Sequence, residues 1–251
     1  MKTIDLFNLD GKVISKIELP KQFDADVRPD LVKRAFLSAR SSSRQRYGAS
    51  PDAGKRPSAK LPKRRKHYKT SYGYGISRVP RKIMSRRGRR MIWVGAFAPG
   101  MVGGRRAHPP KSEKNLVKKI NKKEKKLAIC SAIASLNMKV LEQKIESLTK
   151  TKELFGLLNS IKINIGKKKL IAGKGKLRRG RYKTKKGPLI VVSADCPLLR
   201  RAKNLAGVDI AVVNSLNIQL LAPGGVIGRT TIWSEGAIKK LKEENLFAQN
   251  G

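Results

Sequence analysis

Asp195 is the acidic side chain that the sequence places best for catalysis. It follows the apolar run LIVVS, and catalytic groups of parallel α/β sheets often lie directly after such strands. It also precedes Pro197, a residue typical of the first turn of a helix, where an aspartate caps free backbone amides without doing chemistry. No Ser, His and Asp set accompanies it. We therefore interpret Asp195 as a helix cap and expect no enzyme activity and no catalytic residues.

The spacing of cysteine and histidine does not predict a metal centre. Cys130 and Cys196 are far apart and form no CxxC pair, so two small buried side chains in a reducing compartment are the simplest interpretation. His67 and His108 also lack partners at the spacing of a zinc site. We expect no metal and no disulfide.

The glycines do not form a nucleotide-binding loop. Gly73 and Gly75 lie within a basic stretch, and Gly224, Gly225 and Gly228 precede a predicted strand. A loop that cradles phosphate follows a strand and opens a helix, and neither set has that context. The sequence therefore predicts no cofactor.

Positive charge is the dominant chemical feature of the chain. Among 251 residues, 58 are Lys or Arg and 17 are Asp or Glu, for a net charge of +41. Such a charge opposes compaction unless a polyanion neutralises it. No apolar run approaches the roughly 18 residues that span a bilayer, and Asp5 and Asp10 stand where a signal peptide would be apolar. Nucleic acid is therefore the expected partner, and no membrane partner is expected.

Residues 41–110 carry much of this charge. They contain 19 Lys and Arg and one acid, Asp52, with frequent Gly, Pro and Ser and no sustained helical or strand period. Ordering such a segment costs on the order of 70–140 kcal/mol of backbone entropy, so its composition predicts that it does not fold by itself. We expect a partner that contacts most of its length, and we predict an extended internal loop embedded in a large folded RNA.

Residues 167–186 form a second basic block, with 11 Lys and Arg and no acid. A phosphate-binding surface is the favoured interpretation over a solvated face. Arginine suits bidentate phosphate contacts, and lysine supplies point charges. The candidate RNA-binding side chains of the two basic regions are Arg44, Arg46, Lys55, Arg56, Lys63, Arg64, Arg65, Lys66, Arg78, Arg81, Lys82, Arg86, Arg87, Arg89, Arg90, Arg105, Arg106, Lys174, Arg178, Arg179 and Arg181.

The rest of the chain predicts strands that alternate with helices. IDLFNL and KVISKIEL flank Asp10-Gly11, a dipeptide that favours a tight turn between strands. PLIVVSAD, VDIAVV, IQLL and RTTIW predict further strands, and the near-continuous apolar runs are typical of strands covered on both faces. Helices are predicted from Pro29, over 197–205 and after the capping residue Ser234.

Two more helices are predicted in the middle of the chain. One begins after the N-cap Ser112 and keeps apolar residues at helical spacing through Leu136, and the other covers about 139–148. We predict an α/β fold, a layered and mostly parallel sheet with flanking helices that is Rossmann-like. Residues 1–40 and 111–251 are expected to form this domain, and 41–110 the long basic internal loop.

Four strings of residues resemble a known family. They are RQRYGASPDAGKRPSAK at 44–60, SYGYGISRVPRK at 71–82, AFAPGMVGGRRAHPPK at 96–111 and GVDIAVVNSLNIQLLAPGGVIGRTTIWSEGAIKKL at 207–241. With them the chain resembles, nearly end to end, the universal large-subunit ribosomal protein L-four family in its archaeal and eukaryotic branch. Since the long C-terminal extension of eukaryotic members is missing after Gly251, we expect an archaeal-type protein.

The resemblance implies a structural constituent of the cytoplasmic large ribosomal subunit. It implies a globular domain on the outer face bound to several rRNA domains, rRNA binding early in assembly, and a loop that reaches the polypeptide exit tunnel beside protein L-twenty-two. By motif, the loop tip corresponds to Ile76–Ala98, with Ile76, Arg78, Pro80 and Arg81 as the expected tunnel-facing residues. The implied partners are large-subunit rRNA, neighbouring proteins and the nascent polypeptide, and no homo-oligomer is expected.

Two other classes of function stay open at this point. An RNA-modifying enzyme with a basic substrate arm would need a cofactor turn or paired acids in a cleft, and methyl transfer or RNA cleavage would identify it. A histone-like packaging protein would prefer DNA or show no preference. Binding to rRNA fragments and to duplex DNA at matched salt would distinguish that class.

Overall fold

The computed structural model describes residues 2–61, 65, 71–88, 90–174 and 180–247. The chain divides into two units. Unit 1 comprises Met1–Ser43 and Val117–Gly251, and unit 2 comprises Arg44–Leu116.

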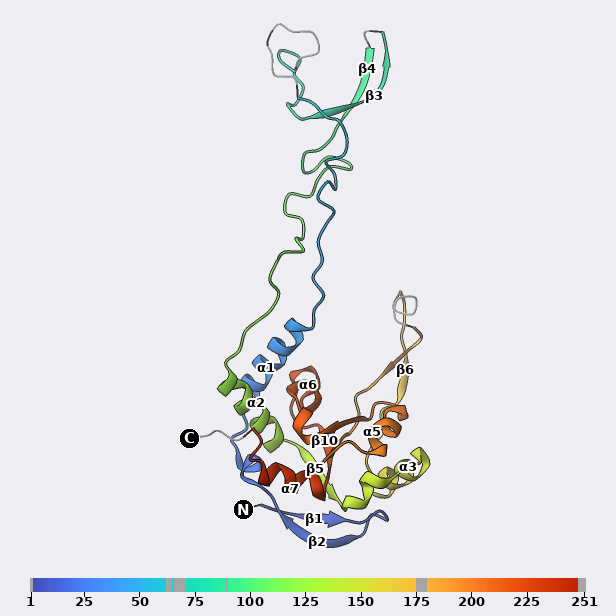
Figure 1. Ribbon diagram of the computed structural model, residues 1–251. Coiled ribbons are helices and arrows are strands. Elements are labelled where there is room, and N and C mark those ends of the chain that lie inside the picture. The colour runs from blue at the N-terminus through green and yellow to red at the C-terminus, as the bar shows by residue number, and fades with distance from the viewer. Residues whose placement is uncertain (1, 62–64, 66–70, 89, 175–179, 248–251) are drawn as a thin grey trace. The chain divides into compact units, whose positions relative to one another are not determined.

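Unit 1 is built on a six-stranded sheet in the order β2-β1-β5-β10-β8-β9 (Figure 1). β2 runs antiparallel to β1, whereas each of the other neighbouring pairs is parallel. The predicted α/β fold with a mostly parallel sheet is therefore confirmed. The strands are β1 (Thr3–Phe7), β2 (Val13–Glu18), β5 (Asn137–Leu141), β8 (Leu189–Val192), β9 (Asp209–Val212) and β10 (Thr230–Ser234).

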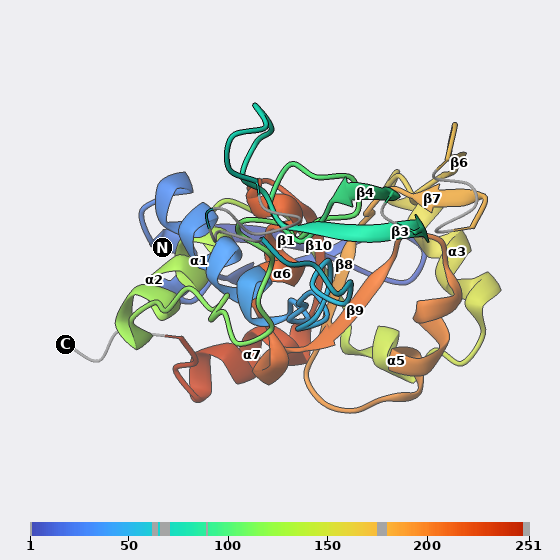
Figure 2. The same cartoon turned by 90° about the horizontal axis from the view of Figure 1, so that it is seen from above.

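The two faces of the sheet pack into two hydrophobic cores. Leu189 and Val191 of β8 contribute to the first core, and Ile190 and Val192 to the second, because successive side chains of a strand point to opposite faces. Seen from above (Figure 2), α1 and α2 lie toward one side and α3 and α5 toward the other. The first core is covered by α1 (Pro29–Ser42), α2 (Lys122–Ala134), α6 (Ile218–Leu221) and α7 (Glu235–Glu243), and the second by α3 (Thr151–Ser160) and α5 (Pro197–Arg201).

Local chemistry explains the elements that were predicted correctly. Between β1 and β2, Gly11 adopts φ +83°, and the Asn8 side chain accepts hydrogen bonds from the amides of Asp10 and Lys12 at 3.0 and 2.8 Å. At the start of α7 the Ser234 hydroxyl accepts from the Ala237 amide at 3.1 Å. Both the turn and the cap were read from the residue types alone.

The helix predicted after the N-cap Ser112 begins nine residues later than expected, at Lys122, with Asn121 as its N-cap. The segment before Lys122 does not form a helix, because its backbone is hydrogen-bonded to side chains of α1. The Lys118 amide donates to Ser41 Oγ at 2.9 Å, and Ser38 Oγ donates to the Lys118 carbonyl at 2.6 Å. Helical spacing of the apolar residues was therefore not sufficient, because tertiary hydrogen bonds satisfied the backbone in another way.

Three further elements differ from the prediction. The helix expected at 139–148 is strand β5 followed by a 3₁₀ turn, Gln143–Ser147, and IQLL is the short helix α6 instead of a strand. Helix α3 was not predicted. Runs of four or five residues do not distinguish helix from strand. β5 is fixed by pairing with both β1 and β10, and α6 by the Asn217 side chain, which accepts from the Leu220 amide at 2.9 Å.

Unit 2 contains an antiparallel hairpin, β3 (Arg81–Arg87) and β4 (Arg90–Gly95). The expectation that this part of the chain has no regular structure was therefore wrong. In β4 exposure alternates, with Met91 and Trp93 partly buried and Ile92 exposed. The alternation of exposed and partly buried residues in β4 is hard to detect from the sequence, because the strand is only six residues long and lies among frequent glycines and arginines.

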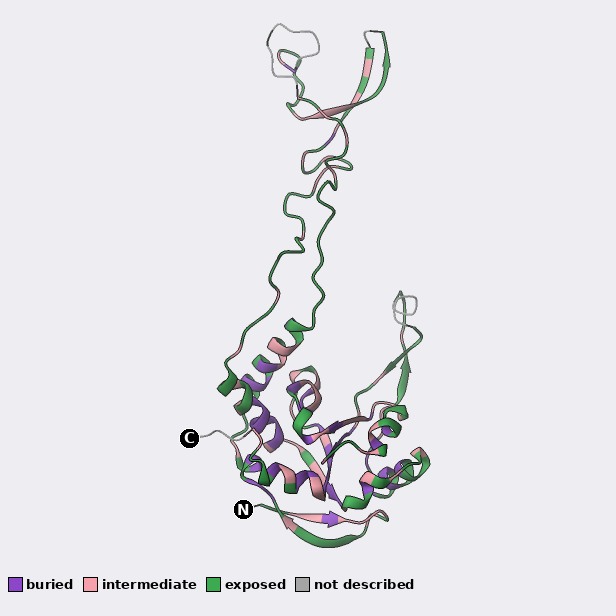
Figure 3. Ribbon diagram, in the orientation of Figure 1, coloured by how far each residue is buried: buried purple, intermediate pink, exposed green. Residues whose placement is uncertain are grey.

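Two arms of unit 2, residues 44–61 (the first arm) and 96–116 (the returning arm), lie antiparallel to one another. The Ala49 amide donates to the Pro110 carbonyl at 3.0 Å, and Gly54 lies against the backbone of Arg105. The first arm also pairs with the start of β3, where Lys60 and Arg81 exchange backbone hydrogen bonds at 3.3 and 3.2 Å. Gly48 permits the approach of the two arms, because a Cβ there would lie 2.6 Å from the Ser112 amide nitrogen. Most described residues of the arms and the hairpin are exposed or half-buried (Figure 3).

Candidate nucleic-acid interface

The predicted cations of the arms are directed to solvent. Arg44, Arg46, Lys55 and Arg56 of the first arm are exposed. On the returning arm Arg106 is exposed, and Arg105 is half-buried next to the position where Gly54 brings the two backbones together. Arms that carry charge outward along their length are suited to contact with a polyanion.

The hairpin β3–β4 concentrates charge at its end. Arg86, Arg87 and Arg90 are exposed, Lys82 is half-buried, and Arg87 lies directly opposite Arg90 in the register. Like charges across a strand pair are destabilising, and a phosphate between them would relieve the repulsion.

Two arginines stack on one aromatic ring in unit 2. The guanidinium of Arg65 lies 5.1 Å from the ring centroid of Tyr72, and that of Arg78 lies 4.5 Å from it. Such cation–π contacts hold the guanidinium planes in place. Pre-ordered guanidinium groups lose less entropy when they bind phosphate.

Arg81 is turned toward the chain. One guanidinium nitrogen donates to the Ser77 carbonyl at 2.6 Å and another to the Val79 carbonyl at 3.4 Å, while the group lies 5.1 Å from the Trp93 ring centroid. Its geometry is that of a residue that holds the turn at 77–79. Of the other expected tip residues, Ile76 and Arg78 are exposed and Pro80 is half-buried.

The second basic block forms a hairpin in unit 1, with strands β6 (Lys168–Leu170) and β7 (Tyr182–Thr184) (Figure 1). Lys169 lies opposite Lys183, and the next pair is Leu170 opposite Tyr182. Leu170 and Tyr182 are 62% and 56% exposed. One face of this ribbon therefore presents paired ammonium groups and the other presents an apolar pair. The candidate residues Lys174 and Arg181 are exposed near it.

Some candidate residues lie outside the described residues. They are Lys63, Arg64, Lys66, Arg89, Arg178 and Arg179.

A further cationic surface, missing from the candidate set, lies in unit 1. This lysine groove has a volume of about 670 Å³ and runs along α1, the start of α2 and α6. Its basic lining residues are Lys118, Lys119, Lys122 and Lys125, and its apolar lining includes Ala35, Ala39, Ile120 and Ile218. The dense lysines of 118–126 are the signal in the sequence that could have indicated this surface, but the helix predicted from 113 to Leu136 would have spread them over its solvent-facing sides.

The ion pairs seen among the described residues all lie in unit 1. In unit 2 the acids Asp52 and Glu113 are both exposed, and no described arginine or lysine of that unit has an acidic partner within ion-pair distance. The charge of unit 2 is therefore left for an external anion to neutralise.

At the carboxyl ends of strands β8 and β10, polar side chains are hydrogen-bonded to one another. Glu146 accepts from the Ser193 amide and hydroxyl, both at 2.8 Å, and from the Ser234 hydroxyl. Asp195 is exposed and does not cap α5, whose N-cap is Cys196 without a side-chain hydrogen bond. The capping prediction for Asp195 was therefore wrong. Glu146 is used in packing the strand ends together.

The thiols are suited to packing. Burial raises the pKa of the Cys130 thiol, which donates to the Phe247 carbonyl at 3.1 Å, and burial also raises the pKa of Cys196. Neither side chain is therefore a reactive thiolate at neutral pH. Within the described ranges, no cluster of three or more His, Cys, Asp or Glu side chains could hold a metal ion. In the same ranges no helix is both long and apolar enough to cross a bilayer.

An α/β domain with cations exposed on arms, hairpins and a groove is typical of structural proteins that bind nucleic acid. The model of the ribosomal protein L4/L1 family matches residues 17–244. The chain belongs to this family, and it is accordingly a structural ribosomal protein without enzymatic activity, as the sequence predicted.

Relatives match the chain along almost its whole length. The large ribosomal subunit protein uL4 of Nanoarchaeum equitans is 43% identical, with 97% of this chain and 99% of that protein covered. The protein of the same name from Methanocaldococcus jannaschii is 40% identical, with coverage of 97% and 99%. That from Pyrobaculum aerophilum is 41% identical, with coverage of 95% and 89%. The expected archaeal similarity is confirmed.

Proposed function

We propose that this protein is a structural constituent of the large ribosomal subunit that binds rRNA directly and contacts several rRNA domains. The observation that carries the proposal is the exposed charge of unit 2, whose described cations have no acidic partner within the unit. Its relatives are named as large-subunit proteins. A polyanion rich in phosphate matches this charge, and rRNA is the polyanion of a ribosome.

Three separate cationic surfaces support contact with more than one RNA segment. They are the arms with hairpin β3–β4, the hairpin β6–β7 and the lysine groove. Each lies on a different element of the chain, so each can neutralise a different stretch of phosphates. A protein that joins RNA segments in this way favours their early convergence, and we include a role in subunit assembly in the proposal.

The loop is the second part of the proposal. We propose that residues 41–110 are embedded in rRNA, that Ile76, Arg78, Pro80 and Arg81 lie at the polypeptide exit tunnel, and that protein L-twenty-two and the nascent polypeptide are neighbours there. Exposure of Ile76 and Arg78 supports this assignment. We likewise propose the description of the domain as Rossmann-like, since helices cover both faces of its mostly parallel sheet.

Salt dependence of binding tests the first part. For six to ten phosphate contacts, affinity for a large-subunit rRNA transcript should fall about 10³–10⁵-fold between 50 and 200 mM salt. At matched salt, the transcript should bind more tightly than duplex DNA of equal length. A flat salt response would contradict phosphate binding, and equal affinity for DNA would favour a packaging protein.

Crosslinking within ribosomes tests the second part. A photoreactive side chain placed at Ile76 should crosslink to a stalled nascent chain. The control is the same group at Val226, an exposed residue of unit 1, which should not crosslink to it. Equal crosslinking at both positions, or none at Ile76, would contradict the tunnel assignment.

A further inference from the structure

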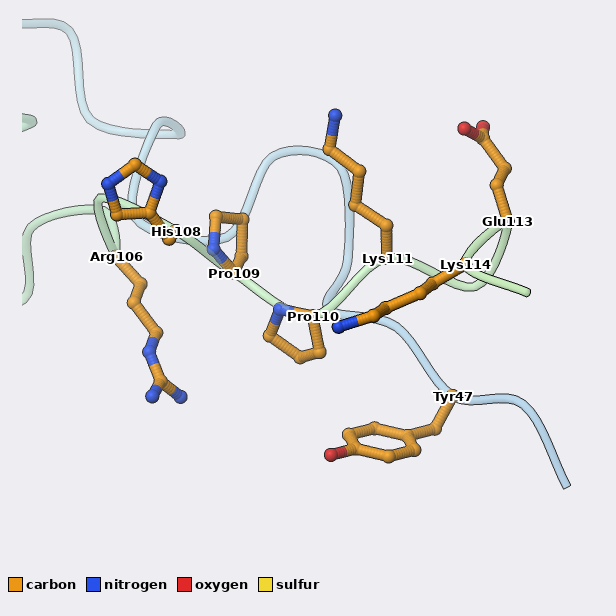
Figure 4. Close-up of a pocket in the computed structure, with 8 residues that line it drawn as sticks. All are labelled: Tyr47, Arg106, His108, Pro109, Pro110, Lys111, Glu113 and Lys114. Carbon is orange, nitrogen blue, oxygen red and sulfur yellow. The ribbon is translucent and has the colours of Figure 1, made fainter. Parts of the chain in front are cut away.

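A pocket of about 620 Å³ lies within unit 2, where the two arms pass one another (Figure 4). We call it the Tyr47 pocket. Tyr47 comes from the first arm, and all other lining residues come from the returning arm. They are Arg106, His108, Pro109, Pro110, Lys111, Glu113 and Lys114.

Backbone contacts build this pocket. The Ala49 amide donates to the Pro110 carbonyl at 3.0 Å, and the Lys114 amide donates to the Lys111 carbonyl at 3.2 Å. Gly48 lets the arms approach beside the tyrosine. Tyr47 is nevertheless 65% exposed, so a large aromatic ring stands open to solvent beside the paired backbones and is not used in a protein core.

The side chains around the ring divide into two sets. Arg106 and the Lys114 ammonium lie on the same side of the returning arm as the Tyr47 ring and Pro110 (Figure 4). Lys111 and Glu113 extend away from the ring (Figure 4). The acid therefore does not neutralise the two cations next to the tyrosine, and the site combines a flat aromatic face with uncompensated positive charge.

This combination matches one nucleotide. Bases stack on aromatic rings, whereas phosphates bind arginine and lysine. An acidic peptide would match the cations but would leave the ring face unused.

We propose that the Tyr47 pocket binds a single unpaired nucleotide of RNA, with its base against the Tyr47 ring and its phosphate at Arg106 and Lys114. The proposal rests on the proposed RNA-binding function and adds to it a base-dependent contact within a mainly electrostatic interface. The low aromatic content of the chain, 5%, makes such a contact distinguishable from the rest.

The test uses the full chain and two probes of equal length. One is a 12-nucleotide single-stranded polyadenylate, and the other is its abasic analogue, which keeps the ribose-phosphate chain and lacks the bases. The variants are Tyr47→Leu, which removes the aromatic face, and Tyr47→Phe, which keeps it. The matched control is Tyr74→Leu, because Tyr74 is 69% exposed in the same unit and is not among the lining residues of the pocket.

Tyr47→Leu should weaken binding of polyadenylate by on the order of 5- to 150-fold, the value of one base–aromatic stack. Binding of the abasic probe should be unchanged, and Tyr47→Phe and Tyr74→Leu should bind both probes as the parent chain does. Hydrogen exchange at the Ala49 amide, unchanged between Tyr47→Leu and the parent, would show that the arms still pair.

Three results would overturn the proposal. Equal losses for both probes would mean that Tyr47 acts on the backbone or on charge. Unchanged polyadenylate binding in Tyr47→Leu would remove the pocket from the interface while leaving the proposed function intact. Tyr47-dependent preference for a polyglutamate peptide over polyadenylate would assign the pocket to an acidic protein. If the parent chain bound neither RNA probe at low salt, the proposed function itself would fail.

Discussion

Arg229 lies almost fully buried before β10, where its charge is matched within the domain. It donates to the carbonyls of Gly187 and Leu220 and, at 2.7 Å, to the Asp209 carboxylate. Lys186 donates to the same carboxylate at 2.8 and 2.9 Å. Burial raises the pKa of Asp209, but the hydrogen bonds and charges of Lys186 and Arg229 outweigh it, and the net effect lowers that pKa.

Asp209→Asn should therefore destabilise unit 1 at neutral pH by about 1.5–3 kcal/mol, the value of hydrogen bonds to charged groups. A depressed folded-state pKa stabilises the fold above the unfolded value, about 3.9, and this contribution is lost as the pH falls through the folded value. The difference in unfolding free energy between parent and variant should thus be largest near pH 7 and shrink below about pH 4. Urea unfolding at both pH values measures it.

Lys186→Met is the control for this pair. The Lys186 side chain is 57% exposed, so its loss should cost at most about 1 kcal/mol. A larger cost for Lys186→Met than for Asp209→Asn would show that the buried arginine is not the group that needs the carboxylate.

Glu146 gives a second prediction for a single side chain. Glu146→Gln replaces one acceptor oxygen by a donor, facing Ser193 and Ser234, which both donate to it. The partly buried site has one acceptor oxygen fewer, so a serine hydroxyl must turn round or lose its bond, and the variant should lose about 1–3 kcal/mol of stability in urea unfolding. Glu153→Gln on α3, whose carboxylate is 47% exposed in an ion pair with Lys150, should change stability by less than about 1 kcal/mol.

At the scale of elements, the sequence predicts best where a local signal is complete. Three features follow from the residues that form them alone, and each is found in the structure. They are the apolar run of β8, the Asp10-Gly11 turn and the Ser234 cap. β5 has no such signal, because Lys139 lies among its five residues and its neighbours in the sheet come from distant parts of the chain. Local reasoning could not supply those neighbours.

The candidate interface was predictable in the same limited way. Charge density located the two basic regions, but the lysine groove needs α1, α2 and α6 to meet. The inward turn of Arg81 likewise depends on Trp93, which lies on the partner strand. The residue types predict which regions carry charge, and only the fold decides which side chains point outward.

The hairpin β6–β7 leads to a prediction about charge. Lys169→Gln removes one of two opposed ammonium groups, so the hairpin should be no less stable, whereas rRNA affinity should fall. The slope of log affinity against log salt should become shallower by about 0.7–0.9, the loss of one phosphate contact. Lys239→Gln on α7, where Lys239 already pairs with Glu235 at 2.7 Å, should leave the slope unchanged. Equal slopes for all three proteins would exclude Lys169 from the interface.

The close approach of the two arms at Gly48 leads to a prediction about a steric clash. Gly48→Ala should separate the arms, because the added Cβ meets the Ser112 amide nitrogen. Exchange at the Ala49 amide, which is bonded to Pro110, should therefore become faster. Gly156→Ala on α3 has open space around its Cβ and should leave exchange at Ala49 unchanged. Unaltered exchange in Gly48→Ala would show that the arms pair without this close approach.

At the scale of the whole molecule, the two units should be separable. Both hydrophobic cores are made of unit 1 residues. Replacing residues 44–116 by a short Gly-Ser linker should leave the thermal unfolding midpoint of unit 1 within a few degrees of the parent value, about the effect of 1 kcal/mol or less. The salt slope for rRNA binding should fall by several units, since most of the arm contacts are lost. Unfolding of the shortened protein would mean that unit 1 needs unit 2 for its stability.

The bonds from Ser38 and Ser41 to Lys118 have a mechanical consequence. They clamp the chain at the point where it departs from α1 and at the point where it comes back. A force applied to the returning end of residues 44–116 acts first on the two hydrogen bonds that join Lys118 to α1, before it reaches α2. A change in the length of residues 44–116 would likewise leave the sheet undisturbed, because the two ends of that segment are hydrogen-bonded to each other through Ser38, Ser41 and Lys118.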